Sequence, residues 1–177
     1  MNAPSPDNEN DTRPMGRRMA WLAAIALIGV LWLFFDGFEA RRANPNRHLA
    51  VAPGQSSEMV LKRNPSGHYI APGTINGQPV TFMLDTGATQ VAIPARLGKK
   101  LGLRPVGPPV YVSTANGTAE ARMTRIDELA FGSFVLTQVQ ASLNPGMDDD
   151  DLILLGMNVL KHLEFTQSGD TLVLRKR

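Results

Sequence analysis

An aspartate at the end of an apolar run is the feature that most limits how this chain can fold. In "FMLDTGATQVAIP", residues 82–94, three apolar residues precede Asp85, and Thr-Gly-Ala follows at once. The apolar residues predict a buried strand, the glycine a tight turn, and "QVAIP" a second strand. A buried carboxylate without partners costs several kcal/mol or takes up a proton. Asp85 therefore either has only an unusual structural role or has a function that depends on its unfavourable environment.

Three hairpins are predicted around this motif. Two strand-like runs flank Asn76-Gly77, a dipeptide typical of hairpins because both positions accept positive φ. "PPVYVSTANGTAEARM" predicts a second hairpin with its tip at Asn116-Gly117, and "IDELAFGSFVLTQVQASL" a third that turns at Gly132-Ser133.

A late helix and a last strand complete the predicted domain. "ARLGKKLGL" forms a short helix at most, since its glycines weaken it. "TLVLRKR" predicts the final strand. Short strands, close turns and one late helix indicate a mainly β domain, a small barrel or sandwich. The helix is expected in "LILLGMNVLKHLEF", where one helical face collects Leu155, Val159, Leu160 and Leu163.

Composition excludes several classes of function. The 177 residues carry a net charge of +2, with 18 basic and 16 acidic residues mixed along the chain, so no clustered basic face for nucleic acid is expected. Cysteine is absent, which excludes disulfides and thiolate chemistry. His48, His68 and His162 lack the spacing of metal ligands. We expect no metal and no cofactor.

An apolar segment near the N-terminus predicts a membrane anchor. Residues 19–35 contain 17 residues without a charge, close to the lower limit of about 17–25 for a spanning helix. Trp21 and Trp32 lie near its two ends, where indole rings favour the lipid interface. No small-x-small cleavage site follows, which favours an uncleaved anchor over a signal peptide. Equal numbers of arginines flank the two sides, so charge leaves the orientation open.

The chain accordingly divides into four segments. Residues 1–16, rich in Pro, Asn and Asp, are expected to be a disordered tail. Residues 17–38 are the predicted transmembrane anchor, 39–57 a linker, and 58–177 the folded domain.

The domain resembles the retropepsin-like aspartic proteases of clan AA. The resemblance rests on Met83-Leu84-Asp85-Thr86-Gly87-Ala88, on the hairpin around Asn116-Gly117, and on Leu154-Leu155-Gly156 before a helix. "STANG" and "LLGMNVL" look like the bacterial membrane-anchored members of this clan. Together these motifs cover about residues 67–174.

The resemblance implies a closed, barrel-like half-domain with one short C-terminal helix, acting as a homodimer on a peptide or protein substrate. Such hydrolysis needs two carboxylates about 3 Å apart that share one proton. The chain contains one Asp-Thr-Gly, so two copies related by a two-fold axis would pair their Asp85 residues.

The resemblance also implies a role for each residue of the site. Asp85 would be catalytic, Thr86 would hydrogen-bond across the dimer axis, and Gly87 would admit the substrate backbone. Ala88 would leave the carboxylates without the hydroxyl donor that a serine at this position provides. Thr89 and Met157 occupy positions where retroviral enzymes carry an ion pair, so specificity cannot be transferred from them. The expected flap residues are Ser113, Thr114, Ala115, Asn116 and Gly117, and the expected loop-packing residues are Leu154, Leu155 and Gly156.

Two other interpretations remain open. The chain could be a non-catalytic dimeric β-module used for binding or assembly, or a tethered scaffold in which Asp85 is only a hydrogen-bonded turn residue. For the protease, the resemblance implies a single-pass protein of the bacterial inner membrane, bound to the lipid bilayer through its N-terminal helix, with the catalytic domain in the periplasm.

Overall fold

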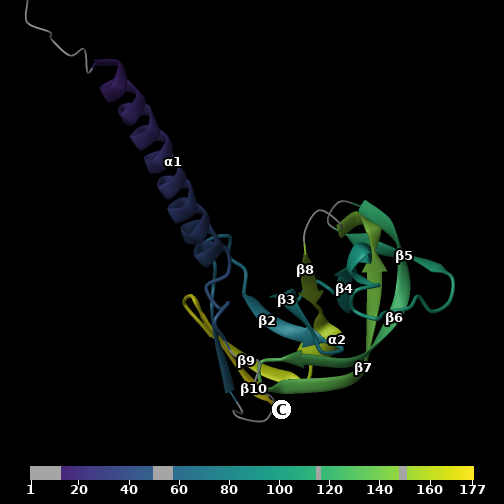
Figure 1. Cartoon of the computed structure of the whole chain (residues 1–177). Coiled ribbons are helices and arrows are strands. Elements are labelled where there is room, and N and C mark those ends of the chain that lie inside the picture. The colour runs from purple at the N-terminus through teal and green to yellow at the C-terminus, as the bar shows by residue number, and fades with distance from the viewer. Residues whose placement is uncertain (1–12, 50–57, 115–116, 148–150) are drawn as a thin grey trace, which may run out of the picture. The chain divides into compact units, whose positions relative to one another are not determined.

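The computed structural model describes residues 13–49, 58–114, 117–147 and 151–177 (Figure 1). The chain separates into two compact units, Met1–Ala40 and Arg41–Arg177. The first unit contains most of one helix, and the second contains all the β-structure.

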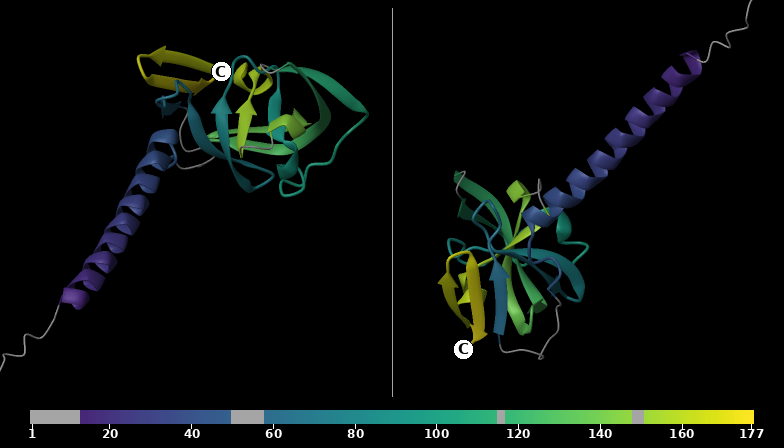
Figure 2. Two further views of the ribbon diagram at one scale, coloured as in Figure 1. Left: turned by 90° about the horizontal axis from the view of Figure 1, so that it is seen from above. Right: turned by 90° about the vertical axis from the view of Figure 1, so that its left-hand side faces the viewer.

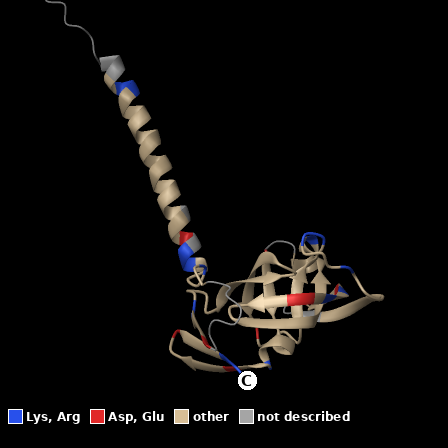
Figure 3. Cartoon of the chain, turned by 60° about the horizontal axis from the view of Figure 1, so that its bottom comes forward, with Lys and Arg blue, Asp and Glu red and all other residues tan. Residues whose placement is uncertain are grey.

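The helix α1, Arg13–Ala43, is 31 residues long and begins and ends outside the predicted anchor of residues 17–38. Its apolar side chains are exposed, with Trp21 and Trp32 both at 68%. Between the basic residues near its two ends lies a long stretch without charge (Figure 3). By length and composition the helix is sufficient to cross a membrane, a test that a signal sequence also passes. Most of the predicted tail, residues 1–12, lies outside the described residues.

The second unit contains a seven-stranded mixed sheet and a three-stranded antiparallel sheet. The seven-stranded sheet has the order β2-β3-β8-β4-β7-β6-β5, and β2 also pairs with β6, which closes this sheet into a barrel. The three-stranded sheet, β1-β10-β9, lies at one end of the domain, and the β5–β6 hairpin extends from the other end (Figures 1 and 2). The strands are β1 Glu58–Lys62, β2 Ile70–Ile75, β3 Gln78–Leu84, β4 Val91–Pro94, β5 Pro109–Thr114, β6 Gly117–Phe131, β7 Phe134–Asn144, β8 Leu152–Leu155, β9 Leu163–Ser168 and β10 Thr171–Lys176.

The predicted hairpins form. Strands β2 and β3 join at Asn76 and Gly77, which adopt φ of 49° and 75°, as a tight hairpin turn requires. Strands β6 and β7 join at Gly132-Ser133, next to the pair Phe131↔Phe134. In the β5–β6 hairpin the last pair is Thr114↔Gly117, and residues 115–116 lie outside the described part of the chain.

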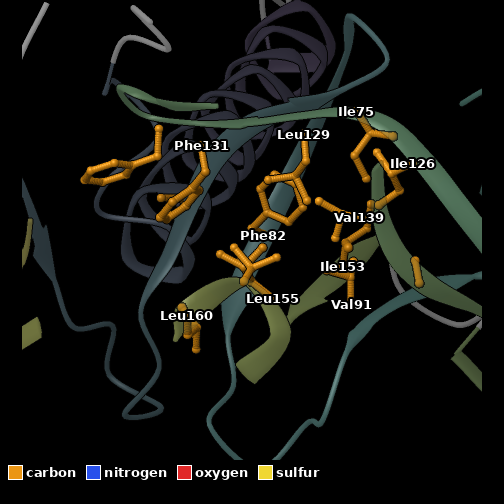
Figure 4. Close-up of a cluster of buried hydrophobic side chains, with 14 of the residues drawn as sticks. Ile75, Phe82, Val91, Ile126, Leu129, Phe131, Val139, Ile153, Leu155 and Leu160 are labelled. Carbon is orange, nitrogen blue, oxygen red and sulfur yellow. The ribbon is translucent and has the colours of Figure 1, made fainter. Parts of the chain in front are cut away.

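The core lies inside the barrel, where Phe82 of β3 packs edge-on against Phe131 of β6 with ring centroids 5.8 Å apart (Figure 4). Both rings are fully buried. Leu61 and Leu174, from the three-stranded sheet, belong to the same buried cluster. One core therefore joins the two sheets, as expected for a domain of this size.

The predicted late helix is much shorter than its pattern suggested. Helix α2, Met157–Leu160, is a single turn, while Leu155 ends β8 and Leu163 begins β9. All four residues of the predicted apolar face are buried, but in three different elements. A short apolar run does not separate a buried strand from a helix, which is why the helical interpretation of Leu155 and Leu163 was wrong. The other predicted helix is the three-residue 3₁₀ turn η1, Ala95–Leu97.

The chain just after α1 is fastened to the β-domain. Asn46 is buried, and its Nδ2 donates to the carbonyl oxygens of Lys62 (2.8 Å) and Ile70 (2.7 Å). Its Oδ1 accepts from the backbone N–H of Lys62 at 2.7 Å. Leu49 packs against the core. Part of the segment predicted as a linker is thus incorporated into the folded unit, whereas residues 50–57 lie outside the described residues.

Candidate active site

Asp85 lies where two parallel strands end side by side. Strand β8 is inserted between β3 and β4, and it pairs with β3 in parallel from Thr81↔Leu152 to Leu84↔Leu155. The backbone N–H of Asp85 continues this ladder by donating to the carbonyl oxygen of Leu155 at 3.2 Å. The position of the aspartate is therefore set by a strand about seventy residues further along the chain.

The turn after β3 is held by the aspartate itself. The Gly87 N–H donates to Asp85 Oδ1 at 2.8 Å, and the Ala88 N–H donates to the Asp85 carbonyl oxygen at 3.2 Å. An aspartate that bonds to the backbone two residues on is a common turn-forming arrangement. Thr86 and Gly87 are exposed in the single chain. Asp85 is half-buried, so the expectation of a buried carboxylate was wrong for this chain, because the side chain opens onto a cavity.

Gly156 holds this turn against the end of β8. A methyl group there would collide with the carbonyl oxygen of Gln90 and lie 2.8 Å from that of Ala88. Directly after the glycine, the N–H groups of Met157 and Asn158 donate to the carbonyl oxygens of Ala88 (2.8 Å) and Thr89 (3.0 Å). Only a residue without a side chain permits this approach, so Gly156 and the Asp-Thr-Gly turn form one packed unit.

A cavity of about 1050 Å³ opens beside Asp85. Its walls come from the turn and β4, from the β5–β6 hairpin, and from the chain at the ends of β7 and β8. Among the described residues that line it, Asp85 is the one with a charged side chain. These residues are Asp85, Gly87, Ala88, Thr89, Gln90, Ala92, Val112, Thr118, Ala119, Ser142, Asn144, Gly146, Met147 and Leu154.

The hairpin predicted as a flap forms one wall of this cavity. Val112 of β5 and Thr118 and Ala119 of β6 line it. Of the predicted flap residues, Ser113 and Thr114 end β5 and Gly117 begins β6 with φ of 108°. The side chains of Ser113 and Thr114 and the whole of Ala115 and Asn116 lie outside the described part of the structure.

The residues predicted to pack against the active-site loop divide between two environments. Leu154 lines the cavity, whereas Leu155 faces the core. Sequence reasoning missed several polar residues of the wall, Gln90, Thr118, Ser142 and Asn144. The alternation in "ASLN" was a usable signal for the last two, because neighbours in a strand point to opposite faces.

In the described part of the chain, no cluster of three or more His, Cys, Asp or Glu side chains is arranged to hold a metal ion. Asp85 and the uncharged cavity around it thus define the chemistry to be explained.

The fold and the site define the class of protein. The β-domain matches the crystal structure of a retropepsin-like aspartic protease from Rickettsia conorii, with a TM-score of 0.56 and 27% identity. The match covers 67% of this chain and 90% of that one. The sequence model of the family described as "gag-polyprotein putative aspartyl protease" matches residues 71–162, more than half of the chain. The chain belongs to this aspartyl protease family.

Two curated proteins are also similar to this chain. An uncharacterized protein in the cobV 5′ region of Sinorhizobium sp. is 32% identical over 126 residues, covering 70% of this chain and 54% of that protein. The uncharacterized protein RP867 of Rickettsia prowazekii (strain Madrid E) is 28% identical over 120 residues, covering 66% and 51%. The chain spans about half the length of the curated relatives it matches.

Substitution of Gly156 should loosen the Asp-Thr-Gly turn. We expect Gly156→Ala to lower the free energy of unfolding by about 3 kcal/mol, because the new methyl group meets backbone carbonyl oxygens that cannot move independently. Urea denaturation followed by circular dichroism measures the change. Gly146→Ala is the matched control, since no atom of the described residues other than its chain neighbours lies within 4 Å of its added methyl group. Equal effects of the two substitutions would contradict the packing argument.

Proposed function

We propose that this protein is a membrane-anchored aspartic endopeptidase whose active site forms between two copies of the chain. The observation that carries the proposal is the placement of Asp85. It projects from a glycine-packed turn into a cavity of about 1050 Å³, beneath a hairpin that can cover a bound peptide. A residue needed only for the turn would have no reason to face a cavity of that size.

The chemistry requires two carboxylates that share one proton. The ionised Asp85 takes a proton from water as the water oxygen attacks the scissile carbonyl carbon, and the protonated Asp85 of the other subunit gives its proton to the carbonyl oxygen. The Asp85 that took a proton from water then gives it to the nitrogen, the carbon–nitrogen bond breaks, and the carbonyl reforms as a hydroxyl of the tetrahedral intermediate returns its proton to the other Asp85. Acid and amine products leave with one proton again on the pair.

A second copy would supply what one chain lacks. Among the described residues that line the cavity there is one carboxylate, and Thr86 and Gly87 beside it are exposed. A two-fold axis through this exposed turn would bring the two Asp85 side chains together and cover both turns. In that arrangement Thr86 bonds across the axis, Gly87 admits the substrate backbone, Ala88 offers the carboxylates no hydroxyl donor, and residues 113–117 close over the substrate as the flap.

The membrane helix adds a further part to the proposal. The apolar helix supports a single-pass anchor, and the bacterial relatives fit a location in the inner membrane. The resemblance to bacterial membrane-anchored members of the clan is the reason for proposing that the catalytic domain lies in the periplasm. Tethering both copies to one surface raises their effective concentration and so favours the dimer.

Removing the carboxylate tests catalysis directly. Asp85→Asn should lower kcat/KM for peptide cleavage by at least ~10³-fold while unfolding and dimerisation stay unchanged, because the proton-sharing pair is lost. A peptide library incubated with the full chain in detergent at several pH values provides the assay, and the exposed Asp170→Asn is the matched control. Unchanged cleavage would refute the protease, and a wild-type chain that cleaves nothing would favour the non-catalytic β-module.

Mixing subunits tests whether the site is shared. Wild type and Asp85→Asn combined in equal amounts and allowed to exchange should retain about one quarter of the activity of the same total amount of wild type, because random pairing leaves that fraction of wild-type dimers. Independent monomeric enzymes would retain about one half. A value near one half, with exchange verified by a tag on one subunit, would contradict the shared site.

Fractionation tests the anchor. The full chain should remain with membranes after alkaline washing, and a chain that begins at Arg41 should be released, because residues 19–35 provide the apolar span. A C-terminal reporter that is active only in the periplasm should be active on the full chain. Release of the full chain by alkaline washing, or reporter activity only in the cytoplasm, would overturn this part of the proposal.

A further inference from the structure

A pair of polar side chains at the end of one strand forms part of the cavity wall, while the residues that alternate with them contribute to the core. Ser142 and Asn144 end β7, which lies parallel to β4 with the pairs Ala92↔Ser142 and Pro94↔Asn144. Their neighbours Ala141 and Leu143 face the core. Because side chains alternate along a strand, Ser142 and Asn144 share the opposite face, and both line the cavity that contains Asp85.

These two residues are almost completely buried, with exposed fractions of 2% for Ser142 and 5% for Asn144. Asn144 Nδ2 donates to Ser142 Oγ at 3.0 Å and lies 3.3 Å from the Ser142 carbonyl oxygen. That carbonyl oxygen can only accept, so the atom facing it must be the nitrogen of the amide. The remaining atom, Asn144 Oδ1, is therefore an acceptor, and it has no hydrogen-bond partner among the described residues.

Three other buried polar atoms of the described structure, Tyr69 Oη, Ser133 Oγ and Asn158 Oδ1, also lack a hydrogen-bond partner, but none of these residues lines the cavity. Asn46, Asn64 and Thr124 each bond to backbone groups and so serve the fold. Buried acceptors in folded proteins nearly always have a partner, and the exceptions call for an explanation. Of these buried residues Asn144 has a free acceptor and lines the cavity, which indicates that its partner arrives with a ligand.

We propose that Ser142 and Asn144 form a subsite that selects a carboxamide side chain, that of Asn or Gln, in the peptide substrate. The inference rests on the proposed protease function and names a preference within it. The amide NH₂ of the substrate donates to Asn144 Oδ1, and its carbonyl oxygen accepts from the Ser142 hydroxyl, whose oxygen already accepts from Asn144. Asn144 Oδ1 is itself buried, so the proposal requires a small rotation about the Cβ–Cγ bond, a soft torsion, that exposes Oδ1 while Nδ2 stays within reach of Ser142 Oγ.

The rest of the wall suits a neutral side chain of this kind. Ala88, Ala92 and Leu154 offer apolar surface for the methylene stem. Among the described lining residues no charged group other than Asp85 is present to pair with a lysine, arginine or carboxylate. A hydrocarbon side chain of equal size would leave Asn144 Oδ1 without a partner, and a site built to hydrogen-bond rejects such an analogue.

The experiment compares near-isosteric peptides on the full chain in detergent micelles. Peptide pairs that differ only by Asn versus Leu, or Gln versus Met, at each position around the cleaved bond are tested for kcat/KM. We expect kcat/KM to be about tenfold higher for the amide peptide of a pair when the exchanged residue occupies one particular position on each side of the cleaved bond. Asn144→Leu should abolish or reverse that preference, and Ser142→Ala should weaken it. Gln167→Leu, a substitution on the exposed edge of β9, is the matched control and should leave it unchanged.

A binding measurement separates this inference from catalysis. The same labelled peptides are titrated onto Asp85→Asn with and without Asn144→Leu, and fluorescence anisotropy gives Kd. An amide preference in Kd that disappears with Asn144→Leu supports the subsite, even if wild type cleaves nothing. Absence of cleavage together with this preference would refute only the protease. Cleavage without the preference, or a preference that survives Asn144→Leu, overturns the subsite and leaves the protease standing. Absence of both cleavage and binding overturns both. Should Asn144→Leu fail to fold, Asn144→Ala, which also removes the acceptor, replaces it.

Discussion

The contact between Gly156 and the backbone of Ala88 and Gln90 is the interaction on which the candidate site depends. It lets the end of β8 lie directly beneath the turn that contains Asp85, and the N–H groups after the glycine then bond to that turn. Asp85 is held from the other side by its ladder bond to Leu155. A carboxylate fixed between two strands in this way cannot drift, which is the condition for bringing two such groups within about 3 Å of each other.

The same geometry explains how a single folded chain fixes Asp85 in place. Asp85 is half-buried and accepts a hydrogen bond from Gly87 of the same chain, so neither its position nor this hydrogen bond requires a second chain. The barrel closed by β2 and β6 holds the core, and the β5–β6 hairpin and the end of β7 are left to shape the cavity. Stability and recognition thus reside in different parts of one sheet, and changes in the cavity wall can alter specificity without disturbing the core.

Local patterns predicted well wherever a few adjacent residues decide the conformation. The hairpin turns at Asn76-Gly77 and Gly132-Ser133 form as predicted because the dipeptides themselves accept the required backbone angles. The helical face assigned to Leu155, Val159, Leu160 and Leu163 was wrong, since the spacing of apolar residues indicates burial but not the element that provides it. Asn46 lay in a segment without any pattern, and only its contacts with Lys62 and Ile70 reveal its role in the fold.

The amino-acid sequence by itself determined the apolar N-terminal helix, the mainly β character of the domain, and the Asp-Thr-Gly turn with its companion glycine. These properties depend on residue type and short spacing. The tertiary structure alone decided that Asp85 faces a cavity, that β8 is inserted between β3 and β4, and that Ser142 and Asn144 share that cavity. Such features arise from pairings between strands far apart in the chain, whose register is set by the packing of the whole sheet rather than by any local signal.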